Sequence, residues 1–469
     1  MAIPWKGFFE PGAVAIIGSF REGLFGGRVM IKTLQEAGFR GRIYPVNPSY
    51  TEVSGVPVWP SVAALPEKPD LAIVMTGAVA VAPVMGELAQ KGVRAAVVVS
   101  DGFAERDEGG RRRQEELLAV ARRAGIRIIG PNTAGIANAA NGFNPCPYEA
   151  GYARIKAGPV AICSQTGMTN PQAYPYNDLG YGISKICDLG NKCDVDESDL
   201  LEYLADDPAT GVISMYLEGI REGRRFLAAA RKTAGRKPVL VLKSGTTAAG
   251  ARAAVSHTGS LAVDDRVFGA ACRQTGIIRL AKFGDLFEIP RIFADQPLSR
   301  GNRLGIVSYT GGIGVLAADE ASRYGLNMAR LSAGTASLLD RIFQGLGQSP
   351  VDVGPLMAVL RGEGFAAVYR RILAAVLSDD NVDCLLNVLW VNPAGGMMEE
   401  EAYEEIYRSL RNGCPKPLAT WLYGPSPALT AGLARRLAAA GFPVFDEMET
   451  AVRALGLAWR YSSHREEIR

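Results

Sequence analysis

Short runs of β-branched and other apolar residues alternate with amphipathic stretches along the whole of this 469-residue chain. A strand buried on both faces reads as a continuous apolar run, and an amphipathic stretch of helical length can cover it. The alternation therefore predicts an α/β fold of parallel sheets covered by helices. The length suffices for about three domains of ~150 residues, each with its own apolar core.

The first third is expected to form one doubly wound domain over residues 1–140. The predicted strands are Val14–Gly18, Ile43–Asn47, Leu71–Met75, Ala95–Ser100 and Ile126–Ile129. The predicted helices lie near Gly27–Ala37, Val81–Lys91 and Gly110–Ala124. A passage rich in Gly, Asn and Pro from Gly130 to Gly158 then breaks the rhythm, which is typical of a linker.

Two further α/β domains are expected over residues 150–295 and 300–460. The predicted strands of the first are Val160–Ser164, Ile183–Cys187, Val212–Leu217, Pro238–Lys243 and Ile277–Leu280. Those of the second are Leu304–Ser308, Asp383–Trp390, Pro417–Leu422 and Pro443–Phe445. Both domains open with a strand and a small-residue turn before a helix, at Ser164–Gly167 (SQTG) and Ser308–Gly312 (SYTGG). The parallel predicts two flavodoxin-like units of similar plan.

Composition excludes several classes of protein. Hydrophobic residues at 48% and charged residues at 21% exclude a disordered or fibrous chain. A net charge of +3 gives no argument for nucleic acid or a membrane surface. The seven cysteines form no CxxC pair, so they are expected to be reduced, with no metal site. Without a signal-like start or a long apolar run, the chain is expected to be cytoplasmic.

The first turn, Gly18–Gly27 (GSFREGLFGG), lies between a predicted strand and a predicted helix. A phosphate-bearing ligand would meet backbone N–H groups at such a helix start. The spacing is not G-x-G-x-x-G, and Ile43–Pro48 offers no carboxylate for a ribose diol. A nucleotide-like ligand other than NAD is therefore favoured, and the alternative is a set of turn glycines needed only for packing.

Of the two histidines, His464 lies in a polar tail and is expected to be exposed, whereas His257 lies in the small-residue stretch Lys243–Ala262. A neutral imidazole is a competent nucleophile near pH 7, although a structural histidine is the alternative. Attack on phosphorus requires that the other ring nitrogen donate its proton to a fixed acceptor. Glu218, at the end of Val212–Leu217, is a candidate for that acceptor; otherwise it is a strand-end residue facing solvent.

The two small-residue turns are candidate anion sites, because hydroxyls, free N–H groups and a positive helix end can hold a phosphoryl group. In the first turn the candidates are Ser164, Thr166 and Gly167, which would hold a phosphoryl group on His257. In the second they are Gly311 and Gly312, for a phosphate or a carboxylate substrate. For the second turn, the alternative is a tight strand-to-helix turn without a ligand.

Longer motifs extend over nearly the whole chain. They are AIIGSF, GFRGRIYPVNP, DLAIVMTGA, VVVSDGFAE and RIIGPN in the first domain, ICSQTG, GYGISKICDLGNKCDVDESDLLEYLADDP, MYLEGI, VLKSG and SHTGSLA in the second, and VSYTGGIGVLAADEA and SPVDV in the third. With these motifs the sequence resembles the NDP-forming acyl-CoA synthetase family, which includes the α subunits of ADP-forming acetate-CoA ligase and of succinyl-CoA synthetase. The resemblance implies a Rossmann-like CoA-binding domain followed by two flavodoxin-like domains.

The resemblance also implies roles for particular residues. His257 would be phosphorylated during turnover, Glu218 would steady it, and the Ser164 turn would hold the phosphate. CoA would lie along the first domain at Gly18, Ser19, Phe20, Arg21, Val46, Asn47, Pro48, Thr76, Gly77, Gly102 and Phe103. No segment reads as an ATP-grasp domain, so the resemblance implies a separate β subunit that binds ADP or ATP with Mg²⁺, in a hetero-oligomer such as α2β2.

Several positions depart from the usual pattern of the family. ICSQTGMTN stands where SQSGA is typical, GPNTAG replaces GPNCxG, and LAVDD follows SHTGS where LAGSD is usual. Met168–Asn170 and Val263 border the expected acyl site, which leaves the acid open. The departures favour one alternative, a CoA- or acyl-CoA-binding regulatory protein without turnover. The fold alone leaves a further alternative, a nicotinamide-dependent oxidoreductase, which the missing strand-end carboxylate disfavours.

Overall fold

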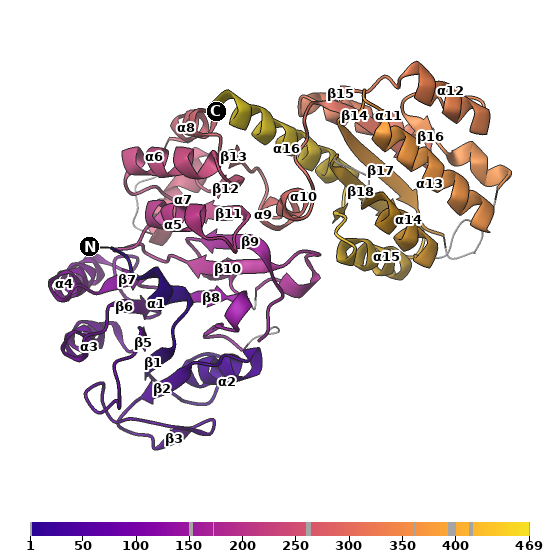
Figure 1. Ribbon diagram of the computed structural model, residues 1–469. Coiled ribbons are helices and arrows are strands. Elements are labelled where there is room, and N and C mark those ends of the chain that lie inside the picture. The colour runs from indigo at the N-terminus through magenta and orange to yellow at the C-terminus, as the bar shows by residue number, and fades with distance from the viewer. Residues whose placement is uncertain are drawn as a thin grey trace. The chain divides into compact units, whose positions relative to one another are not determined.

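The computed structural model describes residues 2–149, 153–171, 173–258, 264–360, 362–392, 400–411 and 416–468, and side chains at 254–258 and 467–468 lie outside the description. The chain divides into two compact units (Figure 1). Unit 1 comprises Met1–Asn177 and Gly182–Leu286, and unit 2 comprises Asp178–Tyr181 and Phe287–Arg469. None of the helices formed by the described residues is long and apolar enough to cross a membrane.

The first sheet of unit 1 has the order β2-β1-β5-β6-β7, with all neighbouring strands parallel. Its strands are β1 (Ala13–Gly18), β2 (Arg42–Val46), β5 (Leu71–Met75), β6 (Ala95–Val98) and β7 (Arg127–Ile129). The helices of this part are α1 (Trp5–Phe9), α2 (Gly27–Ala37), α3 (Ala78–Lys91) and α4 (Glu108–Ala124), and β3 (Glu52–Val53) pairs with β4 (Val56–Pro57). The predicted strands of this region are therefore present.

The second sheet of unit 1 has the order β13-β12-β11-β9-β10-β8. Its strands are β8 (Ile136–Asn138), β9 (Ala157–Ser164), β10 (Ile183–Asp188), β11 (Val212–Leu217), β12 (Val239–Lys243) and β13 (Ile278–Arg279). The α-helices here are α5 (Glu197–Asp206), α6 (Gly223–Ala234), α7 (Ala248–Thr258), α8 (Asp265–Thr275) and α9 (Asp285–Glu288), with short 3₁₀ helices η1 (Ala139–Asn141), η2 (Gly167–Thr169) and η3 (Tyr176–Asp178). Only β8 runs antiparallel to its neighbour.

Unit 2 holds the third sheet, in the order β15-β14-β17-β18-β19, with β16 also paired to β14. Its strands are β14 (Arg303–Ser308), β15 (Asn327–Met328), β16 (Val351–Asp352), β17 (Cys384–Trp390), β18 (Leu418–Tyr423) and β19 (Val444–Phe445). The helices are α10 (Pro290–Ala294), α11 (Gly311–Arg323), α12 (Ala333–Ile342), η4 (Gly354–Ala358), α13 (Gly362–Ser378), α14 (Glu400–Arg411), α15 (Pro427–Ala439) and α16 (Met448–Ile468).

All three sheets follow one plan once β8 of the second sheet and β16 of the third are set aside. In each, the first strand in sequence lies between the second and the third, and the fourth and fifth continue from the third, which is the flavodoxin order 2-1-3-4-5. In such a sheet the chain leaves the first strand at a point where connections diverge to opposite faces, so a crevice forms at the carboxyl edge. The predicted α/β fold of parallel sheets is confirmed.

The prediction of a linker over Gly130–Gly158 is wrong for much of its length. This segment contributes β8 to the edge of the second sheet and contains the first residues of β9. Its glycines and Asn132 serve the backbone, because Gly130, Asn132 and Gly135 adopt φ values of 101°, 58° and 95°. The same composition that suggests a linker therefore builds a tight chain path between the two sheets.

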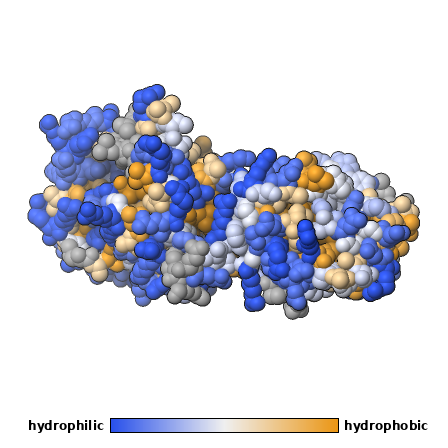
Figure 2. All heavy atoms as spheres, turned by 90° about the horizontal axis from the view of Figure 1, so that it is seen from above, coloured by the Kyte–Doolittle hydropathy of each residue, from blue (hydrophilic) through white to orange (hydrophobic). Residues whose placement is uncertain are grey.

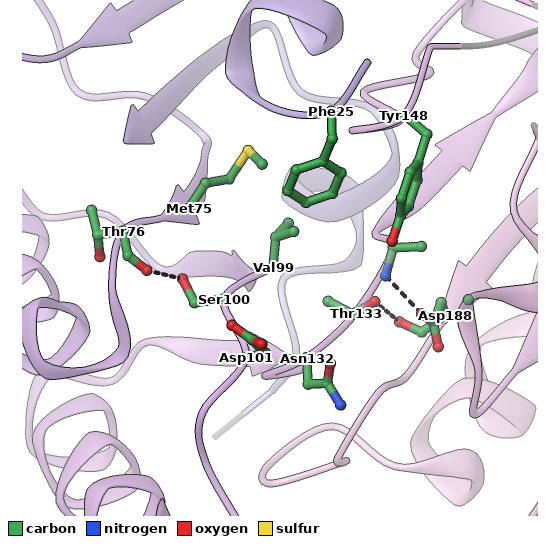
Figure 3. Close-up of a pocket in the computed structure, with 12 residues that line it drawn as sticks. Phe25, Met75, Thr76, Val99, Ser100, Asp101, Asn132, Thr133, Tyr148 and Asp188 are labelled. Carbon is green, nitrogen blue, oxygen red and sulfur yellow. Dashed lines mark hydrogen bonds between the residues drawn. The ribbon is translucent and has the colours of Figure 1, made fainter. Parts of the chain in front are cut away.

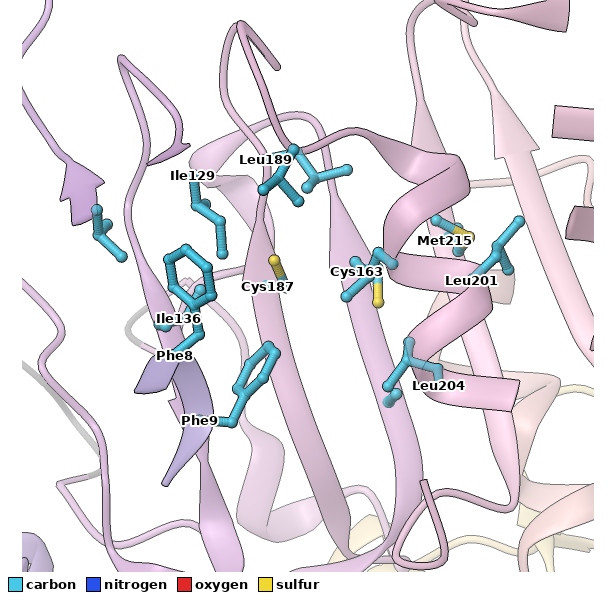
Figure 4. Close-up of a cluster of buried hydrophobic side chains, with 14 of the residues drawn as sticks. Phe8, Phe9, Ile129, Ile136, Cys163, Cys187, Leu189, Leu201, Leu204 and Met215 are labelled. Atoms are coloured by element: carbon cyan, nitrogen blue, oxygen red, sulfur yellow. The ribbon is translucent and has the colours of Figure 1, made fainter. Parts of the chain in front are cut away.

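One apolar core joins the two sheets of unit 1. The residues labelled in Figure 4 include Phe8 and Phe9 from α1, Ile129 from β7, Ile136 from β8, and Cys187 from β10, all less than 4% exposed.

The six described cysteines are buried thiols, and Cys414 lies outside the described residues. The face of the molecule in Figure 2 is mostly hydrophilic, with scattered apolar residues, as expected when most apolar side chains lie inside. The apolar core that the two sheets of unit 1 share fixes the carboxyl edge of one sheet relative to that of the other.

Candidate active site

A polar cavity of about 360 Å³ lies between the two sheets of unit 1 (Figure 3). It is lined by residues that follow β5 and β6, by the segment before β8, and by the ends of β9 and β10. The lining residues are Phe25, Met75, Thr76, Val99, Ser100, Asp101, Asn132, Thr133, Ala134, Tyr148, Gly167 and Asp188. The carboxyl edges of both sheets thus reach one space, where doubly wound proteins bind their ligands.

Two aromatic rings form one wall of the cavity. The ring centroids of Phe25 and Tyr148 are 4.8 Å apart. Backbone hydrogen bonds fix the two segments beside each other, since Gly26 N donates to Pro147 O at 2.7 Å and Glu149 N donates to Leu24 O at 2.8 Å. In Figure 3 the two rings lie beside each other, between Met75 and Asp188. Burial raises the pKa of Tyr148, so its phenol is neutral at pH 7.

The predicted CoA-binding residues fall into two groups. Thr76 lines the cavity, and its Oγ1 is buried without a hydrogen-bond partner among the described residues. Such an orphaned hydroxyl is a candidate donor to a ligand. Ser19, Arg21, Pro48 and Gly77 are exposed around the same edge of the first sheet.

The other predicted CoA-binding residues shape the edge from within. Gly18 has φ 150°, and a Cβ there would lie 2.5 Å from Met75 O, so only glycine allows β1 and β5 to approach. Asn47 Nδ2 donates to Gly18 O at 2.7 Å and ties the second strand to that turn. Val46, Phe20, Gly102 and Phe103 are buried.

The Ser164 turn differs from the prediction in one respect. Ser164 Oγ accepts a hydrogen bond from Thr166 N at 2.9 Å and donates one to Thr166 O at 2.7 Å. The expected helix is only the 3₁₀ turn η2, because Asn170 is extended before Pro171, and a residue before proline disfavours the helical region. The helix dipole predicted at this turn is therefore absent. Gly167 lines the cavity.

Glu218 is buried, which excludes the alternative of a strand-end residue facing solvent. Its side chain is 6% exposed, and Tyr216 Oη donates to its Oε1 at 3.3 Å. Gln165 Oε1 accepts from the backbone N–H groups of Glu218 and Gly219 at 2.9 and 3.2 Å. Gln165 Nε2 is buried and has no partner in the described part of the chain. Sequence reasoning missed the role of Gln165, although it lies within the SQTG motif.

His257 belongs to α7, so 11 residues of the small-residue stretch Lys243–Ala262 are helical. The alanines of this stretch favour a helix, and Thr247 Oγ1 accepts from Gly250 N at 3.1 Å in the first turn. The imidazole of His257 lies outside the described residues. Its pairing with Glu218 and with the Ser164 turn therefore stays a prediction.

Asp188 is the functional candidate that sequence reasoning missed entirely. It ends β10, pairs in register with Ser164 of β9, and lines the cavity at 2% exposure. Its Oδ2 accepts from Ala134 N at 2.7 Å and its Oδ1 from Gly190 N at 3.1 Å. Burial raises the pKa of Asp188 to about 6, and the negative charge of Glu218 acts in the same direction. The available signal was an aspartate at the end of a predicted strand.

Gly311 and Gly312 belong to unit 2 and begin α11. The turn before them is that of Ser164 again, since Ser308 Oγ accepts from Thr310 N at 3.2 Å and donates to Thr310 O at 2.8 Å. A Cβ at Gly311 would lie 3.0 Å from Asp352 Oδ2. A phosphate held there would therefore meet a neighbouring carboxylate.

Fold and site together define a CoA ligase of the succinyl-CoA ligase type. Residues 12–139 match the CoA binding domain family, and residues 157–293 match the succinyl-CoA ligase like flavodoxin domain family. ADP-forming acetate-CoA ligase II subunit alpha of Pyrococcus furiosus is 37% identical over 414 residues, which cover 87% of this chain and 88% of that protein. The chain belongs to the family of ADP-forming acetate-CoA ligases, whose members are NDP-forming acid-CoA ligases.

Other relatives agree. ADP-forming acetate-CoA ligase I subunit alpha of Pyrococcus furiosus is 33% identical over 466 residues, covering 97% of each chain. ADP-forming acetate-CoA ligase II of Archaeoglobus fulgidus is 35% identical over 465 residues, but the chain spans only 67% of that protein. The structure of acetyl-coenzyme A synthetase 1 of Ca. Korarchaeum cryptofilum, in complex with phosphate and ADP, superposes with a TM-score of 0.88 at 28% identity, covering 99% of this chain and 97% of that chain.

Proposed function

We propose that the chain is the α subunit of an acid-CoA ligase that works through an acyl phosphate and phospho-His257. The observation that carries the proposal is the cavity in which the edge of the first sheet, Gly167 of the Ser164 turn and the buried strand-end carboxylate of Asp188 meet. A thioester bound along the first sheet would reach phosphate at the second, as the reaction requires. The family membership of the chain supports the same activity.

The reaction has three chemical steps. Phosphate attacks the thioester carbonyl of acyl-CoA, and the carbon–sulfur bond breaks to give an acyl phosphate and CoA. The imidazole of His257 then attacks the phosphorus, the bond to the acyl oxygen breaks, and the carboxylic acid leaves as its anion. ADP finally takes the phosphoryl group from phospho-His257 to give ATP. Glu218, which is buried and whose backbone N–H is bound by Gln165, would accept a hydrogen bond from the N–H of the other ring nitrogen of His257.

The ligands divide between this chain and a partner. CoA would lie along the first sheet, where the orphaned hydroxyl of Thr76 and the close approach at Gly18 fit a bound ligand. ADP or ATP with Mg²⁺ would bind an ATP-grasp β subunit, in a hetero-oligomer such as α2β2. Two relatives named as alpha subunits, of which the chain covers 88% and 97%, support a partner. A cytoplasmic location stays a prediction.

The domain division 1–140, 150–295 and 300–460 is part of the proposal. Each range would hold one doubly wound sheet, except that one strand of the first range belongs to the sheet of the second. Strand β8, at Ile136–Asn138, lies in the first range and completes the second sheet.

Phosphohistidine formation tests the proposed function. The complex with its cognate β subunit, incubated with labelled ATP, should yield an acid-labile, base-stable phosphoprotein. His257→Asn should abolish the label and reduce acid-CoA ligase turnover by several orders of magnitude. His464→Asn is the matched control, because it removes the only other histidine of the sequence and should label normally. Equal labelling of His257→Asn and the parent would contradict the mechanism.

A further inference from the structure

We propose that Asp188 is the group that exchanges the thiol proton of CoA: it takes the proton as the thioester forms and returns it as the thioester is cleaved. The inference rests on the proposed function and adds an acid–base residue to it. Geometry carries the argument, because the Asp188 carboxylate lines the cavity in which the reacting sulfur and the phosphate would meet.

Asp188 lies where the proposed CoA site and the proposed phosphate site meet. At one end of the cavity are Thr76 and Ser100, at the carboxyl edge of the first sheet, where CoA is proposed to bind. Asp188 and Gly167 line it from the second sheet, and a Cβ at Gly167 would lie 4.0 Å from Asp188 Oδ2. The carboxylate is therefore adjacent to the turn proposed to hold phosphate.

The carboxylate has acceptor capacity left. Ala134 N donates to one of its oxygens and Gly190 N to the other, and the Thr133 hydroxyl is a third donor. A carboxylate can accept about four hydrogen bonds, so a lone pair remains for a thiol proton. The two backbone donors also hold the side chain in one orientation, as a proton acceptor requires.

A purely structural role explains less. Asp352 forms the same local turn in unit 2, where its Oδ1 accepts from Gly354 N at 2.9 Å, and there the side chain is only partly buried. The turn therefore does not require a buried aspartate. Burying a carboxylate beside a second one, Glu218, is unfavourable, and Asn could form a similar turn without a charge. A role in which the Asp188 carboxylate gains and loses a proton would explain why an aspartate is buried here.

The step balances in both directions. In thioester formation the CoA sulfur attacks the carbonyl carbon of the acyl phosphate, the bond between that carbon and the phosphate oxygen breaks, and phosphate leaves with the electron pair. The thiol proton moves to an Asp188 oxygen. In thioester cleavage phosphate attacks the same carbon, and protonated Asp188 gives its proton to the departing thiolate.

The electrostatic surroundings suit this exchange. Among the residues that the structure describes, the titratable groups that interact with Asp188 are Glu218, Tyr148 and Cys187. Burial raises the pKa values of Tyr148 and Cys187, so both are neutral at pH 7 and Glu218 is the group that can add negative charge. With a pKa of about 6, Asp188 is populated in both protonation states near neutrality, which favours general acid–base catalysis.

Asp188→Asn in the complete complex with its β subunit tests the proposal by separating the half-reactions. Labelling of His257 by ATP, and acyl hydroxamate formation from acid, ATP and hydroxylamine without CoA, involve no thiol proton and should stay within about twofold of the parent. CoA-dependent thioester formation should fall by about 10²- to 10⁴-fold, the usual contribution of a general base. The parent rate should fall as pH drops through about 6, and the variant should lack this limb.

Asp352→Asn is the matched control, because it removes the carboxylate of the corresponding turn in unit 2, which does not line this cavity, and it should keep the limb. An Asp188→Asn complex that retains both the limb and the CoA-dependent rate would overturn the proposal and leave the proposed function intact. A parent complex that neither labels His257 nor consumes CoA would instead refute the proposed function. If Asp188→Asn misfolds and loses labelling, the pH dependence of the parent complex still tests the proposal. The fall in rate near pH 6 must then occur in the reaction with CoA and be absent in the reaction with hydroxylamine. A fall in rate that both reactions share would overturn the proposal.

Discussion

The turns after β9 and β14 have the same backbone design and different surroundings. In each, a serine exchanges two hydrogen bonds with the threonine two residues on, and that serine pairs in register with an aspartate, Asp188 for Ser164 and Asp352 for Ser308. In unit 1 the turn ends in a three-residue 3₁₀ helix, whereas in unit 2 it opens the thirteen-residue helix α11. A repeated strand–turn element thus supports two different environments.

The residue inside each turn accounts for much of the difference. Gln165 directs its amide oxygen to the backbone of Glu218 and Gly219, whereas Tyr309 enters an aromatic cluster. The ring centroid of Tyr309 lies 5.8 Å from the ring centroid of Phe365 and 5.5 Å from that of Tyr369. The turn at Ser164 therefore organises a polar site, whereas the turn at Ser308 packs into an apolar core. Substitutions at three residues test this difference.

The largest expected effect concerns the core role of Tyr309. Tyr309→Ala should lower the free energy of unfolding of unit 2 by about 3–5 kcal/mol, because it removes a buried ring and leaves a cavity. Urea titration followed by the fluorescence of the tryptophans of unit 2 would measure the loss. Tyr309→Phe is the control: it removes only the hydroxyl bonded to Tyr403 Oη at 3.2 Å and should cost about 1 kcal/mol. A loss below about 1 kcal/mol for Tyr309→Ala would show that the second turn does not anchor the core.

The next effect concerns the buried charge of Asp188. Its pKa of about 6 in the folded chain, against an ordinary value of 3.8, corresponds to about 3 kcal/mol of lost stability at pH 7. Because the folded state takes up the proton first as pH falls from about 6 to about 4, the parent gains stability over that window. Asp188→Asn should therefore be more stable than the parent at pH 7, by up to about 3 kcal/mol less the loss of one backbone hydrogen bond.

Denaturant unfolding of unit 1 at several pH values would measure this difference. The advantage of Asp188→Asn should shrink toward pH 4, where the parent carboxyl is protonated in the folded state. Asp352→Asn, at the corresponding position of unit 2, should give a smaller change because solvent screens the partly exposed carboxylate. A constant difference between Asp188→Asn and the parent from pH 4 to pH 7 would contradict the raised pKa.

Periodicity predicted the parallel sheets because buried strands are continuous apolar runs, and the strands that carry Ser164, Glu218 and Ser308 lie where the pattern placed them. The pattern failed where composition is ambiguous. Gly130–Gly158 has the residues of a linker, yet its glycines and asparagines allow positive φ values and Ile136 completes a sheet. The small-residue stretch around His257 shows no clear apolar period, yet its alanines form α7.

The site was only partly predictable for a related reason. Glu218 and the Ser164 turn were found because each follows an apolar strand in a recognisable motif. Asp188 was not, because its surroundings include the segment predicted to be a linker, from which Ala134 N donates to its carboxylate. Local sequence can place a side chain at the edge of a sheet, but whether that edge is covered depends on residues that are distant in the chain.

The smallest expected effect tests whether Gln165 holds the site. Gln165→Leu keeps the size of the side chain but removes the oxygen that accepts from two buried backbone N–H groups, so unit 1 should lose about 1–3 kcal/mol. Because the backbone at Glu218 would no longer be fixed, the rate of His257 labelling by ATP should fall while the KM for CoA stays unchanged. Tyr309→Phe, at the corresponding place in the second turn, should leave the labelling rate as in the parent. Equal labelling rates for Gln165→Leu and the parent would mean that the two turns differ in packing alone, and that Glu218 is positioned by its other contacts.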